Sequence, residues 1–451
     1  MKTNTFHLIS LGCAKNTVDS NSMAQMLNIE GFRPVGDPLD AEVLIVNTCG
    51  FIDPAREESY QILGELAAEK QPEQFLVAAG CLSQRFGEEL SRQVPEVDAV
   101  LGTRRWMDIL RVVDRLRDQS QPETLYHLPD VPRVGETPRG IMGAHLQGGS
   151  AYLKIADGCR RPCAFCAIPL IKGPAVSRPL EKILADARIL EEQGIREINL
   201  IAQDTTDYGR DLGVNEGLSE LLEALLLAVP AVDWIRVLYA YPGSVSERLM
   251  KLMAEEKRLL PYLDMPLQHG HPDVLRRMKR PANLDWIYRT VEKLRTAIPD
   301  LALRSTFIVG YPGETQQEFQ ALLDFVEELQ FDRLGTFTYS LEKGTAAEEL
   351  GDPVPEAVKT ARQEELMVRQ QGISLARNQL WVGRELEVLV EGQGAVEGTG
   401  ESISLGRSFR DAPEIDGMVI VEGQLPVGEI APVRITGAMV YDLTGVPAAE
   451  S

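Results

Sequence analysis

The sequence contains no apolar stretch long enough to cross a membrane. Its longest apolar stretches, such as residues 221–229, fall well short of the roughly 20 residues that a membrane helix needs. Residues 1–10 also lack the charged head, long apolar centre and cleavage site of a signal peptide. We therefore expect a cytoplasmic protein without a membrane partner. In that reducing compartment, cysteines bind metal or react rather than pair as disulfides.

Positive charge is also scarce. The chain carries 46 Lys and Arg residues against 67 Asp and Glu residues, which gives a net charge of -21. A negative surface repels a polyanion at long range unless a local basic patch overrides it, so direct RNA binding is not expected. The rest of the composition, 44% hydrophobic and 25% charged over 451 residues, is typical of a globular protein with two or three domains.

The N-terminal part alternates short apolar runs with helical patterns. This alternation is typical of parallel strands, and it predicts an N-terminal parallel α/β domain over residues 1–132. A cysteine follows each of three runs. Because ligands gather at the carboxyl ends of parallel strands, we expect these cysteines to converge on one edge of the sheet. The runs are residues 6–11, 43–46 and 75–79, and the cysteines are Cys13, Cys49 and Cys81.

Three further segments complete the chain. Residues 133–149 are rich in Pro and Gly, which predicts a linker. Residues 150–373 alternate six strand candidates with helical patterns and lack a Rossmann glycine fingerprint, which favours a partial TIM-type (βα)6 barrel. Residues 374–445 predict a small β-barrel. The candidate strands are residues 152–156, 197–202, 234–239, 262–266, 303–309 and 333–339, followed by 385–390, 418–421 and 430–440.

The densest group of cysteines has the spacing CxxxCxxC. Cys159, Cys163 and Cys166 lie directly after the first barrel strand candidate. Three thiolates this close can hold three corners of a cubane iron–sulfur cluster and leave its fourth iron without a protein ligand. Structural zinc is the alternative, but it requires four ligands, and the nearest histidine upstream, His145, lies outside the motif.

With Phe165 before its last cysteine, this motif resembles that of the radical S-adenosylmethionine superfamily. The resemblance implies a 4Fe-4S cluster on Cys159, Cys163 and Cys166, with S-adenosylmethionine bound to the open iron. One electron, from a donor such as flavodoxin or ferredoxin, then cleaves the cofactor to a 5′-deoxyadenosyl radical. The protein directs this radical at the substrate. Arg304, on the fifth strand, is a candidate for a carboxylate or ribose contact with the cofactor.

The same resemblance implies further cofactor contacts. Residues 306–315 resemble the fifth-strand motif whose backbone lies along the adenine, and Gly310 and Gly313 would allow that close approach. A strand-end turn is the alternative. Gln203 and Asp204 end the second strand. At this place family members carry polar groups that face the methionine end of the cofactor, although both residues could instead cap the next helix.

Three N-terminal segments resemble the methylthiotransferase family. In that family their cysteines, here Cys13, Cys49 and Cys81, bind a second 4Fe-4S cluster with an open iron. The resemblance implies that this cluster holds the sulfur while a second S-adenosylmethionine supplies the methyl group. The alternative is three buried cysteines that act as small apolar residues. The segments are residues 10–20, 47–52 and 79–85.

Within this family, four segments resemble the RimO-like branch, which modifies the β-carbon of an aspartate in ribosomal small-subunit protein twelve. A tRNA adenosine 2-methylthiotransferase is the alternative. The chain has Asn21 where this branch often carries an acidic residue, and Lys172 where it often carries Arg. We expect neither position to touch a cluster. The segments are residues 18–20, 49–52, 154–159 and 407–417.

Charge distinguishes these two substrates. Residues 374–451, which resemble a TRAM domain, carry five Arg and no Lys against twelve acidic residues. Binding tRNA requires cations that neutralise phosphates, whereas an acidic module attracts a basic ribosomal protein or serves solubility. We expect residues 406–417 to form a loop near the substrate entrance. The sequence therefore favours the ribosomal protein as the substrate.

Overall fold

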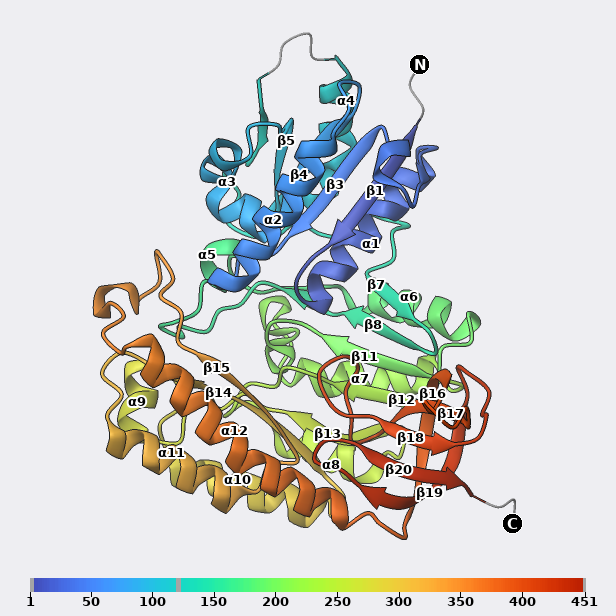
Figure 1. Cartoon of the computed structure of the whole chain (residues 1–451), viewed down its shortest axis with the longest axis vertical. Coiled ribbons are helices and arrows are strands. Elements are labelled where there is room, and N and C mark those ends of the chain that lie inside the picture. The colour runs from blue at the N-terminus through green and yellow to red at the C-terminus, as the bar shows by residue number, and fades with distance from the viewer. Residues whose placement is uncertain (1–3, 119–122, 449–451) are drawn as a thin grey trace.

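The computed structural model describes residues 4–118 and 123–448. Residues 1–3 and 119–122, which belong to the predicted N-terminal domain, and residues 449–451 lie outside the described residues. An N-terminal α/β unit sits on a larger α/β unit, and a small β-barrel lies beside the larger one (Figure 1). Within the part of the chain that the structure describes, no helix is both long and apolar enough to pass through a membrane.

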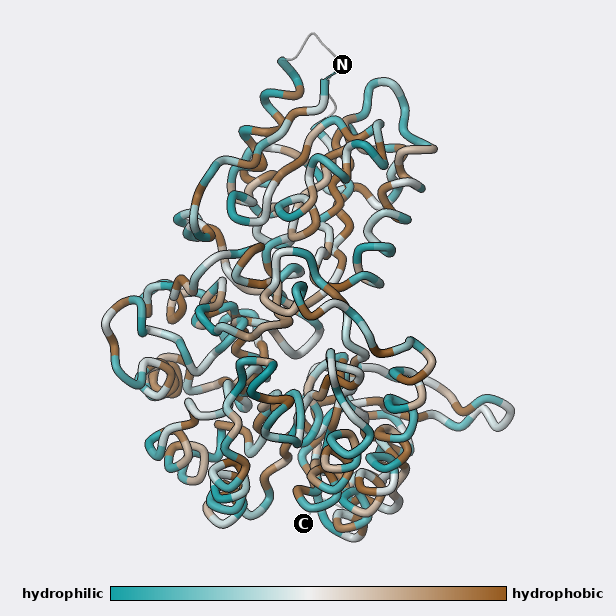
Figure 2. The backbone as a smooth tube through the Cα atoms, turned by 90° about the vertical axis from the view of Figure 1, so that its left-hand side faces the viewer, coloured by the Kyte–Doolittle hydropathy of each residue, from teal (hydrophilic) through white to brown (hydrophobic). Residues whose placement is uncertain are grey.

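The N-terminal unit is a parallel sheet between two layers of helices (Figure 1). Its elements are β1 (Thr5–Ser10), α1 (Ala14–Ile29), β2 (Arg33–Pro34), β3 (Val43–Thr48), α2 (Asp53–Glu69), β4 (Phe75–Gly80), α3 (Cys81–Gln93), β5 (Ala99–Gly102), α4 (Ile109–Asp118) and β6 (Leu125–His127), with the sheet order β2-β1-β3-β4-β5-β6. The central β3 alternates between the two layers: Val43 and Ile45 pack with α1 and α4, and Leu44 and Val46 pack with α2 and α3. Burial on both faces explains the continuous apolar runs, which Figure 2 shows as brown segments inside this unit. The predicted N-terminal parallel α/β domain is confirmed.

The larger unit is an open barrel of parallel strands with helices outside. Its elements are β7 (Ala144–Gln147), β8 (Ser150–Lys154), α6 (Leu180–Glu192), β11 (Glu197–Ile201), α7 (Gly217–Ala228), β12 (Trp234–Val237), α8 (Glu247–Glu255), β13 (Leu259–Asp264), α10 (Leu284–Ala297), β14 (Ala302–Val309), α11 (Gln316–Leu329), β15 (Arg333–Thr338) and α12 (Glu356–Gln379). The sheet order is β15-β14-β13-β12-β11-β8-β7. In the described residues the end strands do not pair with each other, so the barrel stays open. The predicted partial (βα)6 barrel is confirmed.

The segment predicted as a linker, residues 133–149, contains a strand. Within it, β7 runs antiparallel to β8 and forms one edge of the barrel sheet. Four residues are too few to show a period of two against the surrounding Gly and Pro, so the sequence pattern could not reveal this strand. The N-terminal unit docks here, because the Asn21 side chain of α1 donates a hydrogen bond to the Ala144 carbonyl oxygen at 2.7 Å.

The C-terminal unit is a closed β-barrel, as predicted. Its strands are β16 (Glu385–Ala395), β17 (Ser402–Ser408), β18 (Val419–Glu422), β19 (Ile430–Ala438) and β20 (Leu443–Pro447), in the order β16-β17-β18-β20-β19. The sequence did not predict β17 and β20, because glycines such as Gly406 and Gly445 interrupt their alternation.

The segment expected near the substrate entrance, residues 406–417, packs against the barrel. Arg407 donates to Glu197 at 2.6 Å, and the same carboxylate accepts from Arg236 at 2.8 Å. Farther along the segment, Asp416 accepts a hydrogen bond from the Tyr262 hydroxyl at 2.6 Å. Because Glu197 begins β11, Arg407 meets the barrel at the amino end of that strand, whereas Asp416 reaches Arg304 farther along β14. These charges hold the small β-barrel in place, and the position of the segment relative to the substrate entrance stays a prediction.

Candidate functional site

Three adjacent strand ends bring the first cysteine set together. The strands β1, β3 and β4 are neighbours in the sheet, and Cys13, Cys49 and Cys81 follow their carboxyl ends. A Cβ atom added to Gly12 would lie 2.9 Å from the Cys49 Sγ atom, so the backbone before Cys13 touches the second cysteine. The three thiols are also electrostatic neighbours of one another. This arrangement could hold a metal cluster at the edge that faces the barrel.

Gly80 sets the direction in which Cys81 leaves the sheet. Its φ is 101°, and an added Cβ would lie 2.5 Å from the Thr48 carbonyl oxygen and 2.8 Å from the Thr48 nitrogen. We expect Gly80→Ala to lower the free energy of unfolding of the apo chain by about 2 kcal/mol, because strained backbone costs about 1–3 kcal/mol and buried β3 leaves no room to relax. Denaturant unfolding measures this change. The control Gly64→Ala, in α2 with open space around the added Cβ, should be neutral or stabilising, and equal losses would contradict the account.

The second cysteine set lies in the loop that follows β8. The backbone N–H of Cys166 donates to the carbonyl oxygen of Cys163 at 3.2 Å, which curls the loop. Two hydrogen-bond donors approach its sulfur atoms: the Arg161 backbone N–H donates to Cys159 Sγ at 3.4 Å, and the Arg280 guanidinium donates to Cys163 Sγ at 3.6 Å. These donors suit sulfur atoms that carry negative charge.

Burial keeps most of these thiols protonated when they are free. It raises the pKa of Cys81 to about 12, of Cys166 to about 12 and of Cys159 to about 11, and nearby thiols add to each shift. Burial raises the pKa of Cys49 as well. A bound metal reverses this preference, because coordination deprotonates a thiol outright. The donor set therefore fits metal binding better than free nucleophilic chemistry.

A cavity of about 200 Å³ lies between the two α/β units. Phe165 of the second cysteine loop, Ile308 of β14 and Phe51, just beyond Cys49, contribute to its lining. Gln268 lines it too, and the buried Gln268 Oε1 atom has no hydrogen-bond partner among the described residues. An apolar cavity with an unpaired polar atom is typical of a small-molecule site.

Gln203 and Asp204 lie close to the second cysteine set. The Gln203 Nε2 atom donates to Asp157 at 3.1 Å, while its buried Oε1 atom has no partner in the described part of the chain. Asp204 pairs with Arg161 at 2.6 Å, and its side chain makes no cap hydrogen bond to the turn that follows. The capping alternative is therefore wrong for Asp204, and Gln203 offers an acceptor to a ligand.

The remaining predicted cofactor residues either pair with other side chains of the protein or adopt positive φ angles. Arg304 forms ion pairs with Asp264 at 3.0 Å and with Asp416 at 3.3 Å, so its guanidinium is engaged within the barrel. Gly310 and Gly313 adopt φ values of 72° and 77°, as the strand-end turn requires. The turn accounts for both glycines, and a close approach of a ligand to their backbone is compatible with it.

A buried group of charges that sequence reasoning missed joins the two cysteine regions. Lys172 pairs with Asp19 and Asp157 at 3.0 Å each, and Lys154 pairs with the same two carboxylates. Lys172 and Asp19 are also electrostatic neighbours of Cys81. Lys172 therefore lies within electrostatic range of Cys81, whereas the expectation concerned direct contact with a cluster and stays a prediction. The sequence did contain a signal of this buried group of charges, because Asp19, Lys154 and Asp157 belong to segments that resemble the family.

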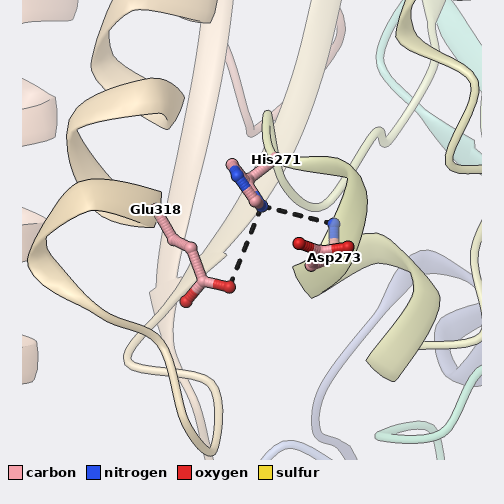
Figure 3. A group of neighbouring side chains, drawn as sticks. All are labelled: His271, Asp273 and Glu318. Atoms are coloured by element: carbon pink, nitrogen blue, oxygen red, sulfur yellow. Dashed lines mark hydrogen bonds and ion pairs between the residues drawn. The ribbon is translucent and has the colours of Figure 1, made fainter.

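A further group of possible metal ligands lies outside the cysteines (Figure 3). The ligand atoms of His271, Asp273 and Glu318 lie within 4.8 Å of one another. The His271 Nδ1 atom accepts a hydrogen bond from the Asp273 backbone N–H, while Glu318 completes the capping box of α11 with Thr315 and pairs with Arg277 at 2.9 Å. Helix capping thus explains this group without a metal.

Solved structures share the fold. The radical S-adenosylmethionine methyltransferase TsrM from Kitasatospora setae, solved with cobalamin and a [4Fe-4S] cluster, matches with a TM-score of 0.55 and 14% identity over 74% of this chain and 72% of its own. The cobalamin-dependent S-adenosylmethionine radical enzyme OxsB matches with a TM-score of 0.51 and 13% identity, over 80% of this chain and 56% of its own. At these identities the likeness shows the fold alone.

Sequence relatives extend over nearly the whole chain. Residues 5–102 match the uncharacterized protein family UPF0004, residues 153–326 the radical SAM superfamily and residues 382–447 the TRAM domain. The radical SAM match implies S-adenosylmethionine and a 4Fe-4S cluster. Proteins named ribosomal protein uS12 methylthiotransferase RimO are similar: that of Roseiflexus sp. (strain RS-1) is 48% identical over 98% of this chain and 96% of its own, and that of Herpetosiphon aurantiacus is 49% identical over 98% and 99%. The chain therefore belongs to the ribosomal protein uS12 methylthiotransferase family.

Proposed function

We propose that this protein transfers a methylthio group to the β-carbon of an aspartate in ribosomal protein uS12. The observation that carries this proposal is the pair of cysteine triplets on facing edges of two α/β units, with the cavity between them. One triplet and cavity would suffice to make a radical. A second triplet is needed where sulfur must also be delivered.

The residues divide into two cluster sites. Cys159, Cys163 and Cys166 would hold the first 4Fe-4S cluster, and Cys13, Cys49 and Cys81 the second. When bound, the first cluster and S-adenosylmethionine supply radical chemistry, and the second cluster with another S-adenosylmethionine supplies the methylated sulfur. The protein itself would bind and orient the cofactor and the substrate, and it would exclude water from the site.

Other residues would receive the cofactor. Phe165 and Ile308 give the cavity apolar walls, and the Oε1 atoms of Gln203 and Gln268, which have no partner among the described residues, would accept hydrogen bonds from a ligand. Asp204 fixes Arg161 beside the cysteine loop through its ion pair. Gly310 and Gly313 would let a ligand approach the backbone, and Arg304 would act indirectly because its own partners are carboxylates of the chain.

Surface charge supports a basic protein substrate. The carboxylates of Asp411 and Asp416 are used inside the structure, but the acidic residues on the outside of the small β-barrel remain exposed. An acidic surface speeds encounter with a highly basic ribosomal protein and repels tRNA. The exposed acidic residues are Glu385, Glu387, Glu391, Glu397, Glu401, Glu414, Glu422 and Glu429.

We place the reaction in the cytoplasm, with flavodoxin or ferredoxin as the electron donor.

Mass spectrometry of cells that lack the gene tests the substrate. We expect uS12 to lose the mass of one methylthio group while tRNA keeps its methylthioadenosine. Loss from tRNA with unchanged uS12 would identify a tRNA adenosine 2-methylthiotransferase instead. A copy of the gene on a plasmid should restore the modification.

Metal analysis tests the cofactors separately from the substrate. After anaerobic reconstitution we expect about eight irons per chain, as two cubane clusters require. About four irons, or zinc, would overturn the proposal of a second cluster.

A further inference from the structure

Lys15 is a buried lysine without a carboxylate partner. It lies in the first turn of α1, two residues after Cys13, and it is 8% exposed. The described residues contain three other lysines of comparable burial, Lys154, Lys172 and Lys359, and each pairs with carboxylates. Lys15 forms no ion pair with any described residue, although a buried ammonium is costly when it lacks an anion.

The ammonium of Lys15 points at the barrel. It lies 3.4 Å from the centroid of the Tyr239 ring, at the carboxyl end of β12. The carboxylate of Asp264 acts on this ammonium electrostatically, but it already pairs with Arg304 at 3.0 Å and accepts the Tyr239 backbone N–H at 3.2 Å. Cys13 is the other group that faces this ammonium. Among the described residues, this cation thus has no carboxylate of its own.

The segment that carries Tyr239 spans the space between the two cysteine sets. Tyr239 has a φ of 62°, an uncommon conformation for an aromatic residue that persists only where its surroundings impose it. Two residues on, the Tyr241 ring lies 3.9 Å from the guanidinium carbon of Arg161 and 4.3 Å from that of Arg280. Both arginines contact the second cysteine set, whereas Lys15 lies beside the first. Lys15 therefore lies between the first cysteine set and the segment that contacts the arginines of the second set.

We propose that Lys15 binds the side-chain carboxylate of the target aspartate and selects it against asparagine. This inference rests on the proposed function. An ammonium has three donors and no acceptor, so it suits a carboxylate and repels the NH2 end of an amide. The carbon that is modified is bonded directly to the carboxylate carbon. Holding the carboxylate therefore fixes the reacting carbon with little remaining freedom.

Binding of uS12 to the reconstituted full-length enzyme tests this inference. We would compare uS12 with a uS12 variant that has Asn in place of the target aspartate. The wild-type enzyme should prefer the aspartate form by about 10- to 100-fold, as expected for a charge-assisted hydrogen bond. Lys15→Met should abolish the preference, and Lys15→Arg should keep most of it. An unchanged preference in Lys15→Met would overturn the inference.

Thermal unfolding of the apo chain separates substrate binding from a structural role. Lys15→Met should leave the unfolding temperature unchanged or raise it, because it removes a buried charge without a counter-ion. The matched control Lys172→Met removes a buried lysine that pairs with two carboxylates, so it should lower that temperature. A comparable loss in both variants would show that Lys15 is structural and would overturn the inference.

Two further outcomes identify the point of failure. If wild-type enzyme neither binds nor modifies uS12, the proposed function fails. If wild-type enzyme modifies uS12 and Lys15→Met changes only the electron paramagnetic resonance signal of the N-terminal cluster, with the aspartate preference intact, Lys15 acts on the cluster and the inference alone fails.

Discussion

Alanine at Cys159, Cys163 or Cys166 is expected to abolish S-adenosylmethionine cleavage, whereas alanine at Cys13, Cys49 or Cys81 should leave cleavage intact and abolish methylthio transfer. The reason is the separation of the two sets on different units of the fold. Loss of one thiolate from a three-ligand site removes its cluster without disturbing the other site. Measurement of 5′-deoxyadenosine and of methylthiolated uS12 in the same reaction gives both readouts.

Iron content provides the internal check for these variants. Each alanine variant should retain about four of about eight irons, because each loses one cubane cluster. Leu170→Ala, a half-exposed side chain a few residues beyond the second set, is the control and should retain all of the iron and both activities. Equal loss of cleavage in both sets of cysteine variants would contradict the division of tasks.

Glu197→Ala is expected to lower the free energy of unfolding by about 3–5 kcal/mol, the usual loss when one partner of a buried ion pair is removed. Glu197 is fully buried and accepts from Arg236 at 2.8 Å and from Arg407 at 2.6 Å. The substitution leaves the two buried guanidinium groups without their shared anion. Because Arg407 belongs to the small β-barrel, that unit should also detach more readily, and denaturant unfolding with limited proteolysis measures both effects.

The control for this variant is a second carboxylate on the same arginine. Glu391 contacts Arg407 at 2.7 Å but is 40% exposed, so Glu391→Ala should cost less than about 1 kcal/mol. Similar losses for the two variants would show that burial of Glu197 does not determine its contribution.

Lowering the pH should remove the contribution of Glu197 to the free energy of unfolding. Burial alone would raise its pKa, but Arg407 and Arg236 outweigh burial and lower the pKa of Glu197 to about 2. A carboxyl group whose pKa is lower in the folded state stabilises that state at pH values above its unfolded pKa of about 4.5. This stabilising contribution disappears as the pH falls from 4.5 towards 2. The difference in stability between wild type and Glu197→Ala should therefore narrow below about pH 4.5.

Local patterns in the sequence were sufficient to predict the cysteine sites. The spacing of Cys159, Cys163 and Cys166 is contained in eight residues, and continuous apolar runs identified the buried strands before Cys13, Cys49 and Cys81. Parallel strands in chain order then required their carboxyl ends to meet. The same reasoning failed for β7, β17 and β20, which are too short or too interrupted to show a period.

Charges buried between units could not be predicted in this way. Asp19 and Lys172 look like surface residues in the sequence, and residues 407–417 look like an exposed loop, yet Asp19, Lys172, Arg407 and Asp411 all pair inside the protein. Their partners lie far away along the chain, and no local pattern reports which charge will be buried.

The sequence by itself thus determined the three-part architecture and the six cysteines, because apolar periodicity and ligand spacing are local properties. Only the tertiary structure decided how the two cysteine sets face each other, where the small β-barrel packs against the larger unit, and that Lys15 meets Tyr239 without pairing with a described carboxylate. These features depend on burial and on contacts between distant segments, and both exist only once the chain has folded.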